Sequence, residues 1–166
     1  MIIIPKLNII KIFMRLRRIY YPFVVNNNKI IIISDEKAHY LRSVLRYQVG
    51  QKLHIFNQQQ QEFFAEILVI KKKQIELKLL EEVKPIKPSC LDLCLVQSIS
   101  KGERMDYSVQ KATELGVNRI QPIFSEFGDV KLKGERLNKK VNHWQNIAIS
   151  ACEQSFRADI PQILTP

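Results

Sequence analysis

The chain has 166 residues, of which 46% are hydrophobic and 25% are charged, and its formal net charge is +10. This length allows one ordinary domain or two small ones. The balance of apolar and charged residues predicts a soluble globular protein and excludes the disordered and fibrous classes.

The positive charge is concentrated in the first third of the sequence. Residues 1–48 carry nine Lys and Arg against two acidic residues, a net charge of +7, whereas residues 91–166 carry ten against nine. This asymmetry favours a module that binds a polyanion, joined to a second part that is nearly neutral. The alternative is a generally basic protein whose lysines are simply solvated.

The cysteines and the first residues exclude several protein classes. Cys90, Cys94 and Cys152 are too few and too scattered for a disulfide framework or a zinc cluster, so we expect three buried thiols in a reducing cytoplasm and no bound metal. The opening MIIIPKLNIIKIF is too short for a membrane span and has no signal-peptide cleavage site. Because Met14 begins a more typical start, we interpret residues 1–13 as a candidate extension outside the fold.

Short strands dominate the sequence from residue 15 to about residue 82. The segments predicted as strands are IYYPFVV, KIIII, KLHIF, EFFAEILVI and QIELKLL. One helix interrupts them, with Ser34 as its expected N-cap and Ala38, Leu41 and Leu45 as its apolar stripe. Several short strands and one helix predict a small, partly closed β-barrel.

Residues 85–89 contain two prolines and have the composition of a linker. The segments that follow are predicted as strand LDLCLVQS, helix ERMDYSVQKATEL, strand RIQPIF, helix ERLNKKVNHWQNIAISACEQ and strand IPQIL. In the long helix, apolar residues recur at helical spacing, namely Leu137, Val141, Trp144, Ala148 and Ala151. This alternation predicts a parallel α/β sheet with right-handed crossovers.

The stretch RLRRIY has a composition that suits RNA. It places Arg15, Arg17 and Arg18 beside Tyr20 and Tyr21. A guanidinium group can donate two parallel hydrogen bonds to a phosphate, and a neighbouring ring can stack on a base.

Three basic residues on the first predicted helix extend this surface. His39, Arg42 and Arg46 are spaced i, i+3, i+7, so a regular helix would place them on one face. Together with RLRRIY they predict an RNA-binding surface. The alternative is a solvated helix face with a few ion pairs.

The most distinctive segment is SKGERMDYSVQKATELGVNRIQPIFSE. Lys101 and Gly102 lie where a strand passes into a helix, Glu103 suits the positive N-terminus of that helix, and Gly116 ends it. Taken alone, this is a βαβ unit without activity. The sequence has no phosphate-binding glycine loop, no metal-ligand spacing and no nucleophile–base pair, and we expect its three histidines to serve in packing or at the surface.

Several segments nevertheless resemble the bacterial 16S ribosomal RNA (uracil-N3)-methyltransferase family. They are RLRRIY, HYLRSVLR, KGERMDYSVQKATELGVNRIQPIFSE, ERLNKK…HWQNIAISACEQSFR and IPQI, and they occur in order and with matching spacing from about Met14 to Pro166. The resemblance implies a PUA-like β-barrel that binds RNA (residues 14–84), a linker (residues 85–89) and a SPOUT-type, trefoil-knot α/β methyltransferase domain, represented in part by residues 90–166.

The resemblance also implies an activity, which is methylation of uridine N3 near the 3′ end of 16S ribosomal RNA. The enzyme would use S-adenosylmethionine and act as a cytoplasmic homodimer in ribosome biogenesis. Uridine N3 is a poor nucleophile until its proton leaves, and the resulting charge spreads onto O2 and O4, where a cationic or amide donor lowers the barrier.

The family motifs point to five candidate catalytic residues. Lys101 and Arg104 match the strand–helix junction, and Glu153, Gln154 and Arg157 match an EQ-x-x-R stretch. No general base is evident among them. Helix capping or ion pairing is the alternative role for each residue.

Two features depart from the family pattern. The turn after LHIF reads NQQQQEF where the family usually has a glycine, which we expect to change only a hairpin loop. The family's cofactor pocket is built from glycine-rich loops and a knotted helix that would follow Pro166, whereas the last glycine here is Gly134. We therefore expect the first half of the methyltransferase domain, no assignable S-adenosylmethionine ligand, and no methyl transfer by this chain alone. The alternatives are a non-catalytic RNA-binding protein and the product of a decayed gene.

Overall fold

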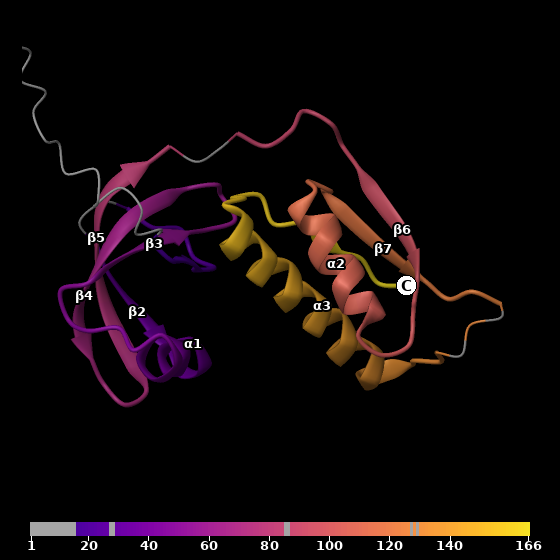
Figure 1. Cartoon of the computed structure of the whole chain (residues 1–166), viewed down its shortest axis with the longest axis horizontal. Coiled ribbons are helices and arrows are strands. Elements are labelled where there is room, and N and C mark those ends of the chain that lie inside the picture. Colours follow the sequence, from indigo (N-terminus) through magenta and orange to yellow (C-terminus); the bar gives the residue numbers. More distant parts are fainter. Residues whose placement is uncertain (1–15, 27–28, 85–86, 127, 129) are drawn as a thin grey trace, which may run out of the picture.

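The chain folds around two β-sheets, one from each half of the sequence (Figure 1). The structure is a computed structural model that describes residues 16–26, 29–84, 87–126, 128 and 130–166. The sequence predicted a partly closed β-barrel followed by a parallel α/β sheet, and the structure has a curled antiparallel-rich sheet followed by a parallel sheet with helices. The candidate extension (residues 1–13) and Arg15 lie outside the described residues. No helix in the described part of the chain is long and apolar enough to cross a membrane.

The first sheet contains five strands in the spatial order β1-β3-β4-β5-β2. These strands are β1 (Arg18–Tyr20), β2 (Ile30–Ser34), β3 (Lys52–Phe56), β4 (Glu62–Ile70) and β5 (Gln74–Val83). Neighbouring strands are antiparallel except β1 and β3, which run parallel. Because β1 and β2 are the two edges, the sheet curls without closing into a complete barrel (Figure 1).

The core of this sheet follows from the alternation of its strands. In β2, Ile31 and Ile33 are buried while the residues between them are exposed, as the two-residue period of a strand requires. Only Ile19 and Tyr20 of the segment IYYPFVV lie in the three-residue β1, because Pro22 has no backbone N–H to continue the ladder. Ala38 and Leu41 close the core from the helical segment, as predicted.

The predicted first helix is two short elements in the structure. α1 (Asp35–His39) continues into a π-helix, η2 (Tyr40–Val44), in which the Leu45 N–H bonds to the Tyr40 carbonyl at 3.0 Å. Ser34 makes no side-chain capping bond; its hydroxyl instead donates to Asp35 at 2.9 Å. Arg46 lies beyond the helix with φ +54°, so the expected single face of three basic residues does not form. The π-turn changes the helical repeat that the spacing assumed.

The second sheet contains three parallel strands in the order β6-β7-β8. The strands are β6 (Cys94–Ser98), β7 (Arg119–Ile123) and β8 (Gln162–Ile163), and the connecting helices are α2 (Arg104–Glu114) and α3 (Gly134–Ser155). Both helices contribute to one core with the strands, where Met105, Val109, Trp144 and Ala148 are buried. The helices therefore cover one face of this sheet (Figure 1).

The cysteines differ from the sequence expectation. Cys152 is buried, but Cys90 and Cys94 are exposed. Cys90 precedes β6 outside any helix or strand, and Cys94 alternates with Leu95, the residue that packs on the helix-covered side. The expectation of three buried thiols was therefore wrong for two of them.

Candidate functional site

The C-terminal end of α3 meets the first sheet at strand β1. The Tyr20 N–H donates to Glu153 Oε1 at 2.9 Å, and Lys37 Nζ lies 3.7 Å from the same oxygen. Tyr20, Phe56 and Cys152 form a small buried cluster beside this contact. Glu153 is thus held between the two halves of the chain.

A second contact between the halves is built around Arg18. Its guanidinium makes a bidentate ion pair with Glu62 at 3.0 and 3.1 Å, and its Nη1 donates to the carbonyls of Cys152 (2.9 Å) and Arg157 (3.2 Å). The group also lies over the Phe56 ring, 4.2 Å from the centroid. We call this arrangement, completed by His54, the buried joint.

The buried joint changes the interpretation of Arg18. Its side chain has 0% exposed surface, and its donors are directed at protein acceptors. Contact with an RNA phosphate would require these bonds to break and the charge to be re-exposed. We therefore assign Arg18 a structural role in place of the RNA-binding role expected from its sequence.

His54 and Glu62 complete the joint with a 2.7 Å contact between Nδ1 and Oε1. Burial alone would raise the pKa of Glu62, but hydrogen bonds from His54 and Arg18, together with the Arg18 charge, outweigh it and hold the pKa below its ordinary value. Glu62 is therefore an anion that neutralises the buried arginine. The sequence motifs gave no indication of either residue, since the pairing is set by sheet register.

Glu153 has the opposite electrostatic character. Burial raises its pKa above the ordinary value of a glutamate, and the Tyr20 N–H and the Lys37 charge offset this effect only in part. The residue also borders a cavity of about 280 Å³, the joint cavity, which is lined by Leu16, Arg17, Arg18, Glu153, Gln154 and Phe156. A carboxylate with a raised pKa at the edge of a cavity is suited to accept a proton.

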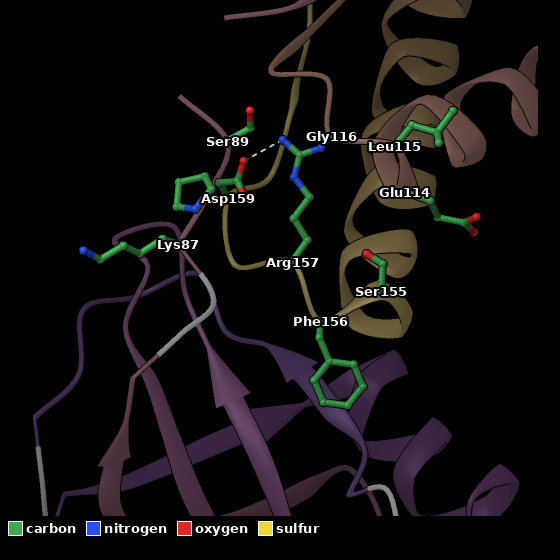
Figure 2. A pocket seen from close by; sticks show the side chains of 10 residues that line it. Lys87, Ser89, Glu114, Leu115, Gly116, Ser155, Phe156, Arg157 and Asp159 are labelled. Atoms are coloured by element: carbon green, nitrogen blue, oxygen red, sulfur yellow. Dashed lines mark hydrogen bonds and ion pairs between the residues drawn. The ribbon is translucent and has the colours of Figure 1, made fainter. Parts of the chain in front are cut away.

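The side chains of Arg157 and Phe156 point in opposite directions from the end of α3. Figure 2 shows its guanidinium directed toward Asp159 and Gly116, while the Phe156 ring points toward the first sheet. Nη1 donates to the Thr113 carbonyl at 2.8 Å and Nη2 pairs with Asp159 at 2.6 Å. Arg157 therefore fixes the end of α3 against the end of α2, and its side chain is mostly buried.

The five candidate catalytic residues do not gather at one point. Glu153, Gln154 and Arg157 lie at the C-terminal end of α3, whereas Lys101 and Arg104 are exposed at the start of α2. The first turn of α2 lies beside His143 and Trp144 of α3, because Asp106 is hydrogen-bonded to both. At 1.5 Å per residue, this point is about 15 Å from Glu153 along α3.

The candidate RNA-binding residues are also divided. Arg17 and Arg46 line one cavity, whereas Arg42 donates to the Lys72 carbonyl at 2.6 Å and His39 contacts the Ser43 hydroxyl at 3.3 Å. The structure thus brings together Arg17 and Arg46, which are far apart in sequence, and separates Arg46 from its expected helix neighbours.

The described residues do not form a recognisable cofactor or metal site. No group of three or more His, Cys, Asp and Glu that could hold a metal occurs among them. The cavity in Figure 2, beside Arg157, measures about 200 Å³ and is open to solvent. We assign no residue of the described chain to S-adenosylmethionine.

Two family models match the sequence in tandem. A model described as RNA methyltransferase PUA domain matches residues 33–80, and one described as RNA methyltransferase domain matches residues 87–166. Ribosomal RNA small subunit methyltransferase E of Buchnera aphidicola (subspecies Schizaphis graminum) is 43% identical over 152 residues, covering 92% of this chain and 62% of the relative. The enzyme of the same name from Bacillus subtilis is 26% identical, covering 80% and 52%.

Solved structures agree with these sequence matches. Ribosomal RNA small subunit methyltransferase E from Neisseria gonorrhoeae, bound to S-adenosyl methionine, has a TM-score of 0.86 and 37% identity, covering 90% of this chain and 62% of that one. A Legionella pneumophila methyltransferase with bound SAM has a TM-score of 0.88 and 39% identity, covering 92% and 63%. The chain spans about 60% of the length of the first curated relatives that it matches. The resemblance inferred from the sequence motifs is thereby confirmed, and the chain belongs to the bacterial ribosomal RNA small subunit methyltransferase E family.

Proposed function

We propose that the protein methylates N3 of a uridine in 16S ribosomal RNA, with S-adenosylmethionine as methyl donor. The observation that carries this proposal is the tandem match to a PUA model and a methyltransferase model, together with 43% identity to a ribosomal RNA small subunit methyltransferase E. Two similar structures contain the bound cofactor. We assign the PUA-like part to residues 14–84, the linker to residues 85–89, and the first half of a SPOUT-type, trefoil-knot methyltransferase domain to residues 90–166.

Glu153 is our candidate for the general base of this reaction. Its raised pKa favours proton uptake, and its position at the joint cavity allows a uridine to approach. Removal of the N3 proton leaves negative charge on O2 and O4 of the base. Gln154, the next lining residue, carries an amide that can donate to one of these oxygens.

The remaining candidates have supporting roles in this proposal. Arg157 positions the end of α3 through Thr113 and Asp159, so that Glu153 keeps its place. Lys101 and Arg104 are exposed cations that suit the RNA backbone better than the reacting base, given their distance from Glu153 along α3. The substrate partner is the small ribosomal subunit or its RNA, and we propose a homodimer in the cytoplasm, as the family resemblance implies.

The test is a methyl-transfer assay with small ribosomal subunits from a strain that lacks the modification. The purified chain is incubated with isotopically labelled S-adenosylmethionine, and labelled uridine is mapped by nuclease digestion and mass spectrometry. Label on uridine N3 establishes the activity. Preferential binding to 16S RNA without transfer would limit the role of these residues to RNA binding. Equal binding to 16S RNA and to an unrelated RNA of the same length, without transfer, overturns the proposal.

A further inference from the structure

A second cavity, of about 350 Å³, lies where three segments of the first half of the chain meet. The residues before β1, the turn after η2 and the start of β3 each contribute one cation to it, namely Arg17, Arg46 and Lys52. We call it the basic cavity. We propose that it binds one nucleotide of single-stranded RNA, next to the nucleotide that is presented to Glu153. This inference rests on the function proposed above.

The charge of the basic cavity favours an anionic ligand. No acidic side chain is among its lining residues. None of the three cations takes part in an ion pair within the described part of the chain, whereas Arg18, Lys37 and other basic residues do. Three uncompensated cations around one hollow concentrate positive potential there, which attracts a phosphate. Glu66 is paired with Lys52 across the β3–β4 ladder but does not line the cavity.

The rest of the lining suits a base and sugar. Leu16, Leu45 and Tyr47 are partly buried and supply an apolar wall, while Gln51 adds an amide. The Tyr47 main chain is tied to Leu41 by a 3.0 Å hydrogen bond, and its hydroxyl is hydrogen-bonded to the main chain of Arg17. The ring is therefore held in place. Aromatic rings beside cations are the usual receptors for unstacked bases of single-stranded RNA.

The backbone at Arg46 supports a functional reason for this residue. Its φ of +54° lies in the left-handed region, where glycine is the favoured residue and a side chain costs conformational energy. Arg46 lies two residues after the end of the π-helix η2, and Leu45 between them also lines the cavity. Strained positions of this kind cluster at ligand-binding sites. The left-handed backbone of Arg46 thus supports a ligand-binding role for its guanidinium.

The basic cavity adjoins the candidate site for the target uridine. Leu16 and Arg17 line both the basic cavity and the joint cavity that contains Glu153 and Gln154. An RNA strand that places one nucleotide in each cavity would pass Arg17 with the connecting phosphate. The bidentate geometry of arginine suits that contact.

The sharpest test combines Arg46→Gly with Lys52→Gln. Glycine adopts the same φ without strain, so the fold is expected to keep a melting temperature close to that of the parent chain. Affinity for a short single-stranded RNA, measured by fluorescence anisotropy, is expected to fall about tenfold or more. The slope of log affinity against log salt should become shallower by about 0.7, because Arg46 and Lys52 share one phosphate and each phosphate contact on single-stranded RNA contributes about 0.7.

The matched control removes exposed cations from the other half of the chain, through Lys131→Gln and Arg136→Gln. It changes the net charge equally, and we expect a loss of less than threefold in RNA affinity. Equal losses in the control and in the cavity variant would show a general charge effect and overturn the proposal. Unchanged RNA affinity in the cavity variant would overturn it as well.

Tyr47 provides a second test that does not alter charge. Tyr47→Leu is expected to weaken binding about five- to hundredfold, the range for losing one stacked base, whereas Tyr47→Phe keeps the ring and should stay within threefold. Equal RNA affinity of Tyr47→Leu and the parent chain would contradict the proposal that the Tyr47 ring stacks on a base in the basic cavity.

Further arms of the same experiment separate the possible ligands and the two proposals. Uridine monophosphate should bind much more weakly than the oligonucleotide, and duplex RNA should not depend on Tyr47. A free nucleotide that binds as tightly as RNA would point to a small-molecule site and overturn the inference. If the cavity variants lose RNA affinity while the parent chain shows no 16S preference or transfer, the cavity is supported and the methylation proposal fails separately.

Discussion

The buried joint and the basic cavity meet at two adjacent arginines whose surroundings differ completely. Arg18 is fully buried, paired with Glu62 and bonded to two carbonyls of the second half of the chain. Arg17 is exposed and lines two cavities without an acidic partner among the described residues. Arg17 directly precedes β1 and Arg18 begins it, and neighbouring residues of an extended segment point to opposite sides. One basic run therefore supplies a buried structural cation and an exposed cation that we propose for ligand contact. Basic composition alone does not distinguish these roles.

The largest expected effect comes from breaking the joint. Arg18→Met should lower the free energy of unfolding by about 3–5 kcal/mol, because Glu62 is then left charged, buried and without its main partner. Urea unfolding at neutral pH measures it. The matched control is Arg17→Met, for which we expect about 0.5 kcal/mol or less. Similar losses of unfolding free energy for the two variants would contradict the assignment of a structural role to Arg18 and not to Arg17.

A double variant sharpens this prediction. Replacing both Arg18 and Glu62 by methionine removes the buried charges together, and an apolar pair is often as stable as the ion pair it replaces. The double variant should therefore be more stable than Arg18→Met alone. If the double variant is less stable than the single one, Glu62 stabilises the fold even without Arg18, through its contact with His54.

Glu62→Gln should give an intermediate effect with a defined pH dependence. Because hydrogen bonds from His54 and Arg18 outweigh burial, the pKa of Glu62 lies below its ordinary value in the folded chain. Its stabilisation is thus present above the ordinary pKa and is lost as the pH falls through the lowered one. We expect Glu62→Gln to cost about 2 kcal/mol at neutral pH and much less in acid. A loss of unfolding free energy that is the same at every pH would contradict the lowered pKa of Glu62.

Glu153→Gln should act in the opposite direction and more weakly. Burial raises the pKa of Glu153, so its favourable contribution is present below the ordinary pKa and is lost as the pH rises through the raised value. The glutamine can still accept the Tyr20 N–H through its carbonyl oxygen. We therefore expect a small gain in stability at neutral pH that disappears in acid, measured by thermal unfolding across pH. A loss at neutral pH would show that the Lys37 contact dominates.

The sequence predicted the regular elements well because they depend on local spacing. Apolar alternation located β2 to β5, and the helical spacing of Trp144, Ala148 and Ala151 located α3. The joint was not predictable in this way, because Glu62 and Cys152 are far from Arg18 in sequence and contact it only in the folded chain. The placement of Arg46 was missed because the spacing assumed a regular α-helix where the chain forms a π-turn. Local pattern therefore found the scaffold, and tertiary contacts decided which charged residues remain accessible.

The smallest expected effect is on the rate at which Cys152 reacts with a thiol reagent. Burial raises the pKa of the Cys152 thiol to about 12, with Arg157 and Arg18 opposing the shift only weakly. Because the reactive form is the thiolate, a thiol-specific reagent should modify Cys90 and Cys94 quickly and Cys152 only after opening. The Cys152 carbonyl is itself an acceptor for Arg18, so Arg18→Met should accelerate labelling of Cys152 while Arg17→Met should not. Equal labelling rates of Cys152 in both variants would mean that α3 stays packed against β1 without Arg18, through the Tyr20–Glu153 hydrogen bond alone.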